Sequence, residues 1–194
     1  PEYATVALGA GLAGGVLPDL DLYTNHRKAL HYPVGYSALA GVATAVAVAV
    51  PSPATVGAVL LLAAAASHSL IDVFGGGLEL RPWEATDDRA VYNHFHGRWI
   101  PPLRWVRYDG APEDLLLSVG LAVPLWFGVD APFRGVVAVS MAVAVVYAAS
   151  RRTLPAIARR LVTEVLPGRV PPSVLAQLPE RYTDGPRGDD AETT

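Results

Sequence analysis

Apolar residues are gathered in five segments of the chain, at residues 3–17, 33–50, 54–74, 115–129 and 133–149. A helix of about 20 apolar residues crosses the ~30 Å hydrocarbon core of a bilayer. The first segment is short for that distance, so it is either a thin span or a re-entrant helix. Small residues permit close helix packing, and Gly9, Gly14 and Gly41 are candidate contact points unless they reflect composition alone. The pattern predicts an all-α integral membrane bundle of about five transmembrane helices.

Two further stretches have an interfacial character. The long connection from Gly75 to Asp114 holds three of the four tryptophans, which favour the lipid headgroup level. Between Leu154 and Val165 apolar residues recur at helical spacing, with Arg159, Arg160 and Glu164 opposite them, so an amphipathic helix at the membrane surface is expected. We therefore expect a membrane-embedded domain over residues 1–166 and a Pro/Gly-rich, acidic tail over 167–194, disordered from about Tyr182.

Composition narrows the chemistry. The 194 residues are 52% hydrophobic and only 17% charged, against about 25% charged residues in a typical soluble domain. The chain has no cysteine, so disulfides and thiolate zinc sites are excluded, and any metal must be held by His, Asp, Glu or water. The net charge of −3, with no basic block, gives no support to a nucleic-acid partner.

Basic residues occupy alternate connections between the apolar segments. They are Arg27 and Lys28, then Arg81, Arg89, Arg98, Arg104 and Arg107, then Arg151, Arg152, Arg159 and Arg160. The positive-inside rule makes this face cytoplasmic, which predicts a multi-pass protein of the cell membrane with its N-terminus outside and its C-terminus cytoplasmic. The lipid bilayer is then a partner, and a protein partner could dock on the cytoplasmic loop or tail.

This topology also brings two polar clusters to one face. Asp19, Asp21, His26 and His31 follow the first apolar segment, and His68 and Asp72 end the third. Ionisable residues in or beside a membrane are costly and usually mark a functional site. Imidazoles and carboxylates are the ligands that zinc and manganese accept. We predict a divalent metal ion, zinc or manganese, held by residues of this set: Asp19, Asp21, His26, His31, His68 and Asp72.

Each residue also has a simpler interpretation. His68 and Asp72 lie four positions apart, which suits two ligands on one helix face but equally a buried hydrogen-bonded pair. Asp19 or Asp21 could cap a helix. The five-residue spacing of His26 and His31 does not fit one face of a regular helix, so a bend or helix start would have to intervene if both are ligands.

Arg27 and four residues of the long connection complete the candidates. Arg27 could bind a substrate anion, pair with Asp19 or Asp21, or only anchor the topology. The remaining candidates, which a solvated loop explains equally well, are His94, His96, Glu79 and Glu84.

The order of these motifs resembles a known family. PDxD at Pro18–Asp21, HR-x3-H at His26–His31, and H-x3-D at His68–Asp72 are followed by Gly75–Gly77 and Pro82. Over residues 1 to 85 this resembles the inner-membrane-associated metal-dependent hydrolases, also described as LexA-binding. Members commonly carry a histidine after a threonine near the start, whereas here Thr5 is followed by Val6.

The resemblance implies a membrane-bound hydrolase that acts on a phosphoester, or on another small-molecule or lipid-derived substrate, through a metal-activated water. Asp72 or Asp21, if not a ligand, would be the general base, and Arg27 would steady an anionic group. The alternative is a non-catalytic integral membrane protein that binds metal or docks a partner. A transporter is less favoured, since no inverted repeat is visible.

Overall fold

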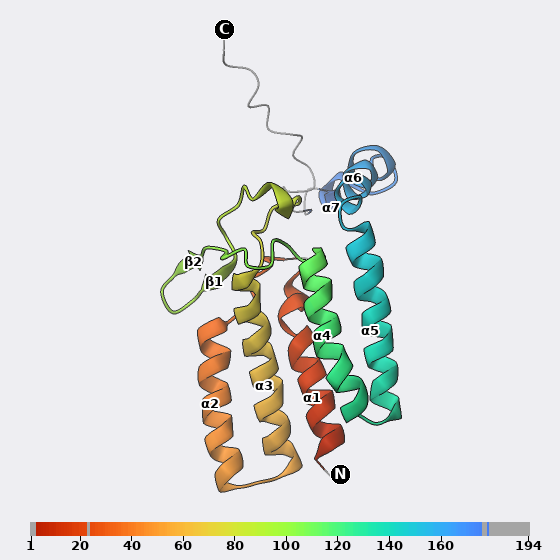
Figure 1. Ribbon diagram of the computed structural model, residues 1–194. Coiled ribbons are helices and arrows are strands. Elements are labelled where there is room, and N and C mark those ends of the chain that lie inside the picture. Colours follow the sequence, from red (N-terminus) through yellow and green to blue (C-terminus); the bar gives the residue numbers. More distant parts are fainter. Residues whose placement is uncertain (1–2, 23, 176–177, 179–194) are drawn as a thin grey trace.

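The computed structural model describes residues 3–22, 24–175 and 178, and the chain is mostly helical (Figure 1). All five apolar segments form helices: α1 (Ala4–Val16), α2 (Pro33–Ala49), α3 (Pro53–Ile71), α4 (Pro112–Gly128) and α5 (Ala131–Ser150). The expected C-terminal helix is present as α6 (Leu154–Arg160), which continues into a π-helical turn at Leu161–Val165, and α7 (Pro172–Leu175) follows. The mostly helical class is therefore confirmed.

The long connection holds the only strands of the described residues. After short 3-10 turns at Asp72–Phe74 and Pro82–Glu84, β1 (Val91–Asn93) pairs antiparallel with β2 (Arg98–Ile100). At the hairpin tip, the Asn93 side chain accepts hydrogen bonds from the backbone N–H groups of Phe95 and His96, and Gly97 has a φ of +64°. An Asn at the turn start and a Gly in the left-handed region are typical hairpin signals, although the hairpin was not among the predictions.

Proline sets the starts of the helices. A proline lies in the first turn of α2, α3, α4 and α5, where its missing N–H costs no hydrogen bond. At the start of α3, Ser52 and Thr55 form a reciprocal capping box. Pro124 lies inside α4 without ending it. These prolines and the capping box mark where each helix begins, which the apolar composition alone does not show.

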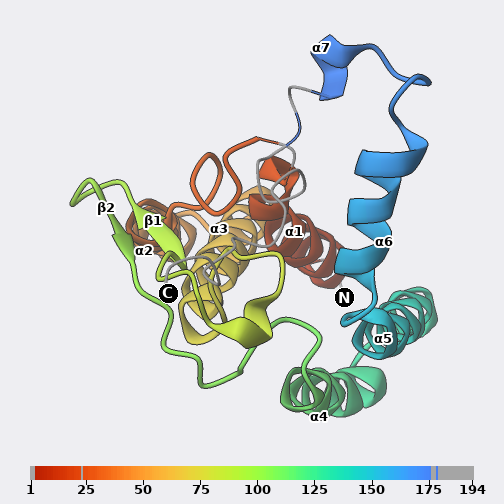
Figure 2. The same ribbon diagram turned by 90° about the horizontal axis from the view of Figure 1, so that it is seen from above.

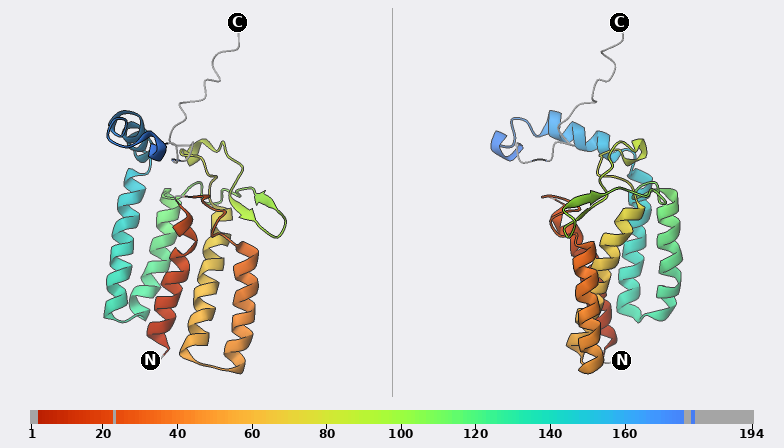
Figure 3. Two further views of the ribbon diagram at one scale, coloured as in Figure 1. Left: turned by 180° about the vertical axis from the view of Figure 1, so that it is seen from behind. Right: turned by 90° about the vertical axis from the view of Figure 1, so that its left-hand side faces the viewer.

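The helices pack as a group of three beside a pair. Helix α3 packs between α1 and α2, and α4 packs against α5, which Figures 2 and 3 show as a pair set beside the other three helices. At Gly14 of α1 an added Cβ would collide with the backbone of Leu61 in α3. Nothing lies within 4 Å of a Cβ added at Gly9 or Gly41. Of the three candidate contact glycines, only Gly14 therefore meets another helix.

Two helices of the described residues are long and apolar enough to cross a membrane: α3 with its extension, over Pro53–Phe74, and α5. Length and composition alone are weak evidence for a membrane span, because the core helix of a soluble protein passes the same test. Helix α2 is apolar but shorter, at 17 residues, and α1 has only 13. The five-span, multi-pass arrangement and its orientation stay predictions.

The polar segments gather at one end of the helices. The end of α1, the start of α2, the end of α3, the hairpin and α6 all lie at this end, whereas the α2–α3 and α4–α5 turns lie at the other (Figures 1 and 3). The two polar clusters therefore meet, as alternation of the helices predicted. The tail predicted from about residue 182 lies outside the described residues.

Candidate metal centre

Four of the predicted side chains converge from three segments of the chain. Asp19 lies in the 3-10 turn Pro18–Asp21 that follows α1, and His31 lies in the loop just before α2. His68 occupies the last turn of α3, and Asp72 is the residue at its C-terminal cap. Because α1 and α3 end side by side, these short segments bring the four groups together.

Nitrogen and oxygen atoms alternate around one point of this cluster. His31 Nε2 lies 3.1 Å from Asp72 Oδ2 and 4.0 Å from Asp19 Oδ1. His68 Nε2 lies 3.3 Å from Asp19 Oδ1 and 3.7 Å from Asp72 Oδ2. Ligands about 2.0–2.1 Å from a tetrahedral zinc ion are separated by ~3.3–3.4 Å, and the four distances lie on both sides of that value. Asp19, His31 and His68 offer ligand atoms that lie within 4.8 Å of one another, so these three residues could hold a metal ion, and Asp72 lies beside both histidines.

The imidazoles of His31 and His68 are each hydrogen-bonded through Nδ1, so that Nε2 faces the centre of the cluster. The Nδ1 of His68 lies 2.7 Å from the backbone carbonyl of Gly15, which can only accept, so Nδ1 carries the proton. The Nδ1 of His31 lies 3.1 Å from Asp21 Oδ2 and donates to that carboxylate in the same way. In both rings the Nε2 lone pair is then free to bind a cation, the usual arrangement of metal-ligating histidines.

Asp21 is engaged by three donors and is buried at 1% exposure. Besides His31, it accepts hydrogen bonds from His26 Nδ1, at 2.9 Å, and from the backbone N–H of Leu30, at 3.0 Å. Burial alone would raise the pKa of the Asp21 carboxyl, but these hydrogen bonds outweigh it and hold the pKa below its usual value. Asp21 is therefore ionised at neutral pH and fixes the orientation of both imidazoles.

His26 lies on the outer side of Asp21. Burial lowers the pKa of its imidazole more than the bond to Asp21 raises it, so the ring is neutral at pH 7. Asp21, His26 and His31 form a second group compact enough for a metal ion. His26 and His31 lie in the loop between the 3-10 turn and α2, and this loop brings both imidazoles to Asp21. Their five-residue spacing, which does not suit one face of a regular helix, is therefore possible here.

Two buried atoms at the centre lack a hydrogen-bond partner among the described residues: His31 Nε2 and Asp72 Oδ2. They lie 3.1 Å apart without hydrogen-bond geometry. With the His31 proton on Nδ1, a nitrogen lone pair faces a carboxylate oxygen, and either a second proton on Nε2 or a metal cation between the two atoms would remove this repulsion. Unpaired buried polar atoms are rare and call for such an explanation.

Arg27 is held next to this cluster in a strained conformation. Its φ of +59° places a non-glycine residue in the left-handed region. Its carbonyl accepts the N–H of Tyr92 in β1, at 2.9 Å, and its Nη1 donates to the carbonyl of Gly76, at 2.8 Å. Its Nε lies 3.7 Å from Asp72 Oδ2. The pairing predicted with Asp19 or Asp21 is thus made with Asp72 instead, and the hairpin positions the arginine.

The other sequence candidates lie in the long connection and contact residues outside the metal cluster. His94 stacks on Tyr32 at 4.2 Å between ring centres, and its Nε2 contacts the carbonyl of Lys28. His96 is exposed near the hairpin tip. Glu84 pairs with Arg81. Glu79 accepts the backbone N–H of Thr86. These contacts suit the solvated-loop interpretation that the sequence left open.

Comparison of the chain with known protein families, curated proteins and solved structures gives no match. The family resemblance therefore stays a prediction that rests on the motifs at Pro18–Asp21, His26–His31 and His68–Asp72.

Proposed function

We propose that this protein is a membrane-embedded, metal-dependent hydrolase. Its metal centre would be formed by Asp19, His31, His68 and Asp72. The observation that carries the proposal is the buried, unpartnered contact between His31 Nε2 and Asp72 Oδ2. A divalent cation between them would remove the repulsion and bring both atoms to their ordinary ligand distances.

The donor set favours zinc, since imidazole and carboxylate together suit that ion, and manganese is the second candidate. A bound zinc ion would lower the pKa of a water molecule towards ~7 and so supply a nucleophile for hydrolysis. The chain's own residues have supporting roles. Asp21 orients His31, and Gly15 orients His68. Arg27, beside Asp72, is placed to bind an anionic group such as a phosphoester.

Asp19 is the residue best placed to take part in proton transfer. Its side chain is 54% exposed, whereas His31 is fully buried. An exposed carboxylate 3.3 Å from His68 Nε2 can accept a proton from an incoming water molecule, or leave the ligand set to open a coordination position. Asp21 is less suited to the role of general base because three donors already occupy its oxygens.

The membrane setting is part of the proposal. Large apolar side chains on α2, α4 and α5 are exposed: Val48 is 80% exposed, Phe127 77% and Leu121 72%. So many large apolar side chains exposed to solvent are unusual for a soluble monomer. A bilayer around five helices would cover it, with the metal centre at the headgroup level of the cytoplasmic face.

A second candidate function is metal binding without turnover. Four protein ligands would complete a tetrahedral site and leave no position for water, which is typical of structural zinc. The observation in its favour is that a fourth donor, Asp72 Oδ2, lies 3.1 Å from His31 Nε2 and 3.7 Å from His68 Nε2, beside the group of Asp19, His31 and His68. Asp19 separates the two functions, because only the hydrolase needs it to be displaced or to act as a base.

The test begins with metal content, measured by elemental analysis of detergent-purified protein after reloading with zinc or manganese. Wild type should hold at least one equivalent, and Asp72→Asn and His68→Ala should lose it. His94→Ala, a histidine removed from the cluster, is the matched control and should retain it. Absence of metal from the reloaded wild type would refute both functions.

A measurement of hydrolytic activity then distinguishes the hydrolase from the metal-binding protein. The hydrolase should cleave an aryl phosphodiester such as bis(p-nitrophenyl) phosphate or an aryl phosphomonoester, and should lose this activity in Asp19→Asn even where metal is retained. Metal without turnover on these substrates, together with weaker metal binding in Asp19→Asn, would favour the binding protein, because its four-ligand site needs Asp19 as a permanent ligand.

A further inference from the structure

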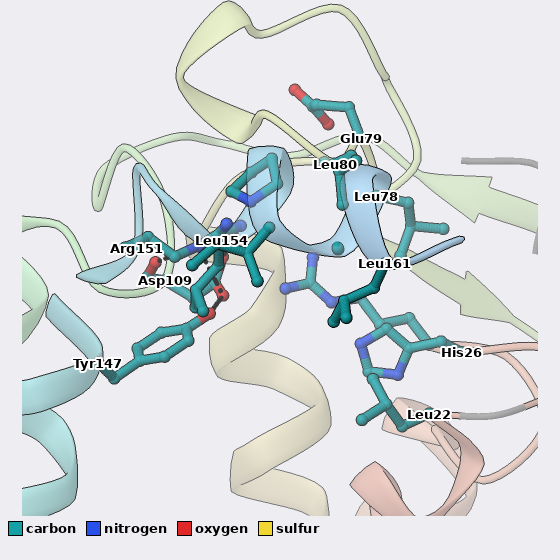
Figure 4. Close-up of a pocket in the computed structure, with 15 residues that line it drawn as sticks. Leu22, His26, Leu78, Glu79, Leu80, Asp109, Tyr147, Arg151, Leu154 and Leu161 are labelled. Carbon is teal, nitrogen blue, oxygen red and sulfur yellow. Dashed lines mark hydrogen bonds and ion pairs between the residues drawn. The ribbon is translucent and has the colours of Figure 1, made fainter. Parts of the chain in front are cut away.

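A cavity lies beside the metal centre on the side of Arg27. It has a volume of about 380 Å³, which lies in the range of small-molecule binding sites. Its walls are the loop that begins at Leu22, the segment Gly77–Leu80, and α6 with its π-helical turn (Figure 4). The cavity therefore lies between the loop that carries the metal-site residues and the amphipathic helix.

Most of the wall is aliphatic, and its polar side chains include Glu79, which Figure 4 shows apart from the others. The large aliphatic residues of the wall are Leu22, Leu78, Leu80, Leu154, Ile157 and Leu161. Figure 4 shows His26 on one side of the cavity and Tyr147, Asp109 and Arg151 on the other. Arg27 also lines the cavity. A ligand that filled it would have an aliphatic part and a compact polar part.

Four charged side chains line the cavity, Arg27, Glu79, Asp109 and Arg151, and Arg27 is the cation among them that pairs with no carboxylate of the wall. Arg151 already pairs with Asp109, its Nε lying 3.4 Å from Asp109 Oδ2, so these two charges offset each other. Arg27 is 9% exposed, and the carboxylate nearest to it, Asp72, belongs to the metal cluster. A metal ion bound to Asp72 would neutralise its negative charge. The positive charge of Arg27 would then be available to pair with an anionic ligand.

We propose that this cavity binds a single-chain anionic amphiphile, of the alkyl phosphate class, with its phosphate at Arg27 and its chain along the aliphatic wall of α6. As the substrate site of the hydrolase, this assignment rests on the function proposed above and names its substrate class. It places the phosphate beside the metal centre and the chain under the amphipathic helix. A headgroup phosphate and free phosphate share the same chemistry at Arg27, so the chain must be tested separately.

The test uses dodecyl phosphate with a photoreactive diazirine in its chain, added to zinc-loaded protein in phosphatidylcholine nanodiscs. After irradiation, the labelled peptides are mapped by mass spectrometry. Label should fall in Leu78–Leu80 and in Leu154–Leu161. The same chain carried on a neutral maltoside should label these peptides far less, and inorganic phosphate at equal concentration should not displace the dodecyl phosphate.

A matched pair of variants on α6 tests the cavity itself. Ala158 lines the cavity, whereas Ala156 is exposed and lies outside its wall. Ala158→Trp should lower the label about tenfold or more because the indole would occupy the ligand's space, and Ala156→Trp should leave it unchanged. Equal label in both variants, or equal label by the maltoside probe, would overturn the proposal.

The metal readout keeps the two proposals apart. Protein that binds zinc but shows no label in α6 retains its metal centre and disproves only the amphiphile site. Protein that is labelled in α6, but binds no metal after reloading, supports the binding site and refutes the hydrolase.

Discussion

Replacing Asp21 with asparagine tests whether this residue orients the metal ligands or is itself a ligand. Oδ2 of Asp21 accepts from His31 Nδ1 and from the backbone N–H of Leu30, whereas Oδ1 accepts from His26 Nδ1. An asparagine carbonyl at the Oδ2 position would keep the first two bonds. Its NH2 group would then face His26, which can adopt the other neutral tautomer and accept.

The geometry of the His31 ring should therefore survive in Asp21→Asn, and only the negative charge is lost. Loss of a partner behind a metal-ligating histidine typically costs 10–100-fold in metal affinity. Because the hydrogen bond to His31 can be kept, we expect the lower end, about tenfold, or ~1.4 kcal/mol. Asp21→Ala removes all three acceptor bonds, so about 100-fold, ~2.7 kcal/mol, is expected there.

The assay is a competition titration of zinc between the detergent-purified protein and a chromophoric chelator at pH 7.5. Asp87→Asn is the control, because Asp87 is also a carboxylate hydrogen-bonded by a basic partner, Arg89, but lies in the long connection. Its zinc affinity should equal that of the wild type.

Two results would refute the reasoning. If Asp21→Asn abolishes zinc binding while His68→Ala retains it, Asp21 is a ligand, and the second group of Asp21, His26 and His31 holds the ion. If Asp21→Ala binds zinc as tightly as the wild type, the bond to His31 Nδ1 has no part in the site.

Three further predictions address packing, burial and pH. Gly14→Ala should destabilise the fold by about 1–3 kcal/mol in thermal unfolding, since its Cβ meets backbone of α3, whereas Gly9→Ala, with open space, should not lower Tm. Ser69→Ala should leave zinc affinity unchanged and Tm equal or higher, because the hydroxyl is buried without a hydrogen-bond partner among the described residues; a marked loss of either would show an unrecognised role. The hydrogen bond from Arg107 lowers the pKa of Glu113 from 4.5 to about 2, so the charged form stabilises the fold above pH ~4.5 and that contribution is lost as the pH falls towards ~2. The small Tm difference between wild type and Glu113→Gln should narrow over this range, and a difference that widened would contradict the sign.

The sequence predicted which helices form and which end of the molecule carries the polar clusters. Apolar runs with proline at their starts become helices, and alternation of helix direction then fixes that residues 19–31 and 68–72 meet. Both inferences depend only on local pattern and chain connectivity, which are present in the sequence.

The division of roles within the cluster could not be predicted in this way. His31 offers Nε2 because Asp21 holds its Nδ1, and His68 offers Nε2 because the carbonyl of Gly15 holds its Nδ1. Every residue has a backbone carbonyl, so the sequence does not indicate which carbonyl will accept a hydrogen bond from His68. The position of Arg27 likewise depends on a backbone bond to Tyr92 in a hairpin 65 residues away, although the Asn93 and Gly97 of that hairpin were a readable turn signal.

Helix packing and metal chemistry are coupled at the end of α1. Gly14 allows the backbone of α1 to touch α3 at Leu61, and the next residue, Gly15, supplies the carbonyl that holds His68 on the same helix. A side chain at Gly14 would push the two helices apart and lengthen a hydrogen bond that is now 2.7 Å. The tautomer of His68 would no longer be fixed, so zinc affinity should fall together with stability in Gly14→Ala. Gly9→Ala should change neither, because it lies on α1 away from this contact. A loss of stability in Gly14→Ala with unchanged zinc affinity would separate the two and show that His68 is oriented without Gly15.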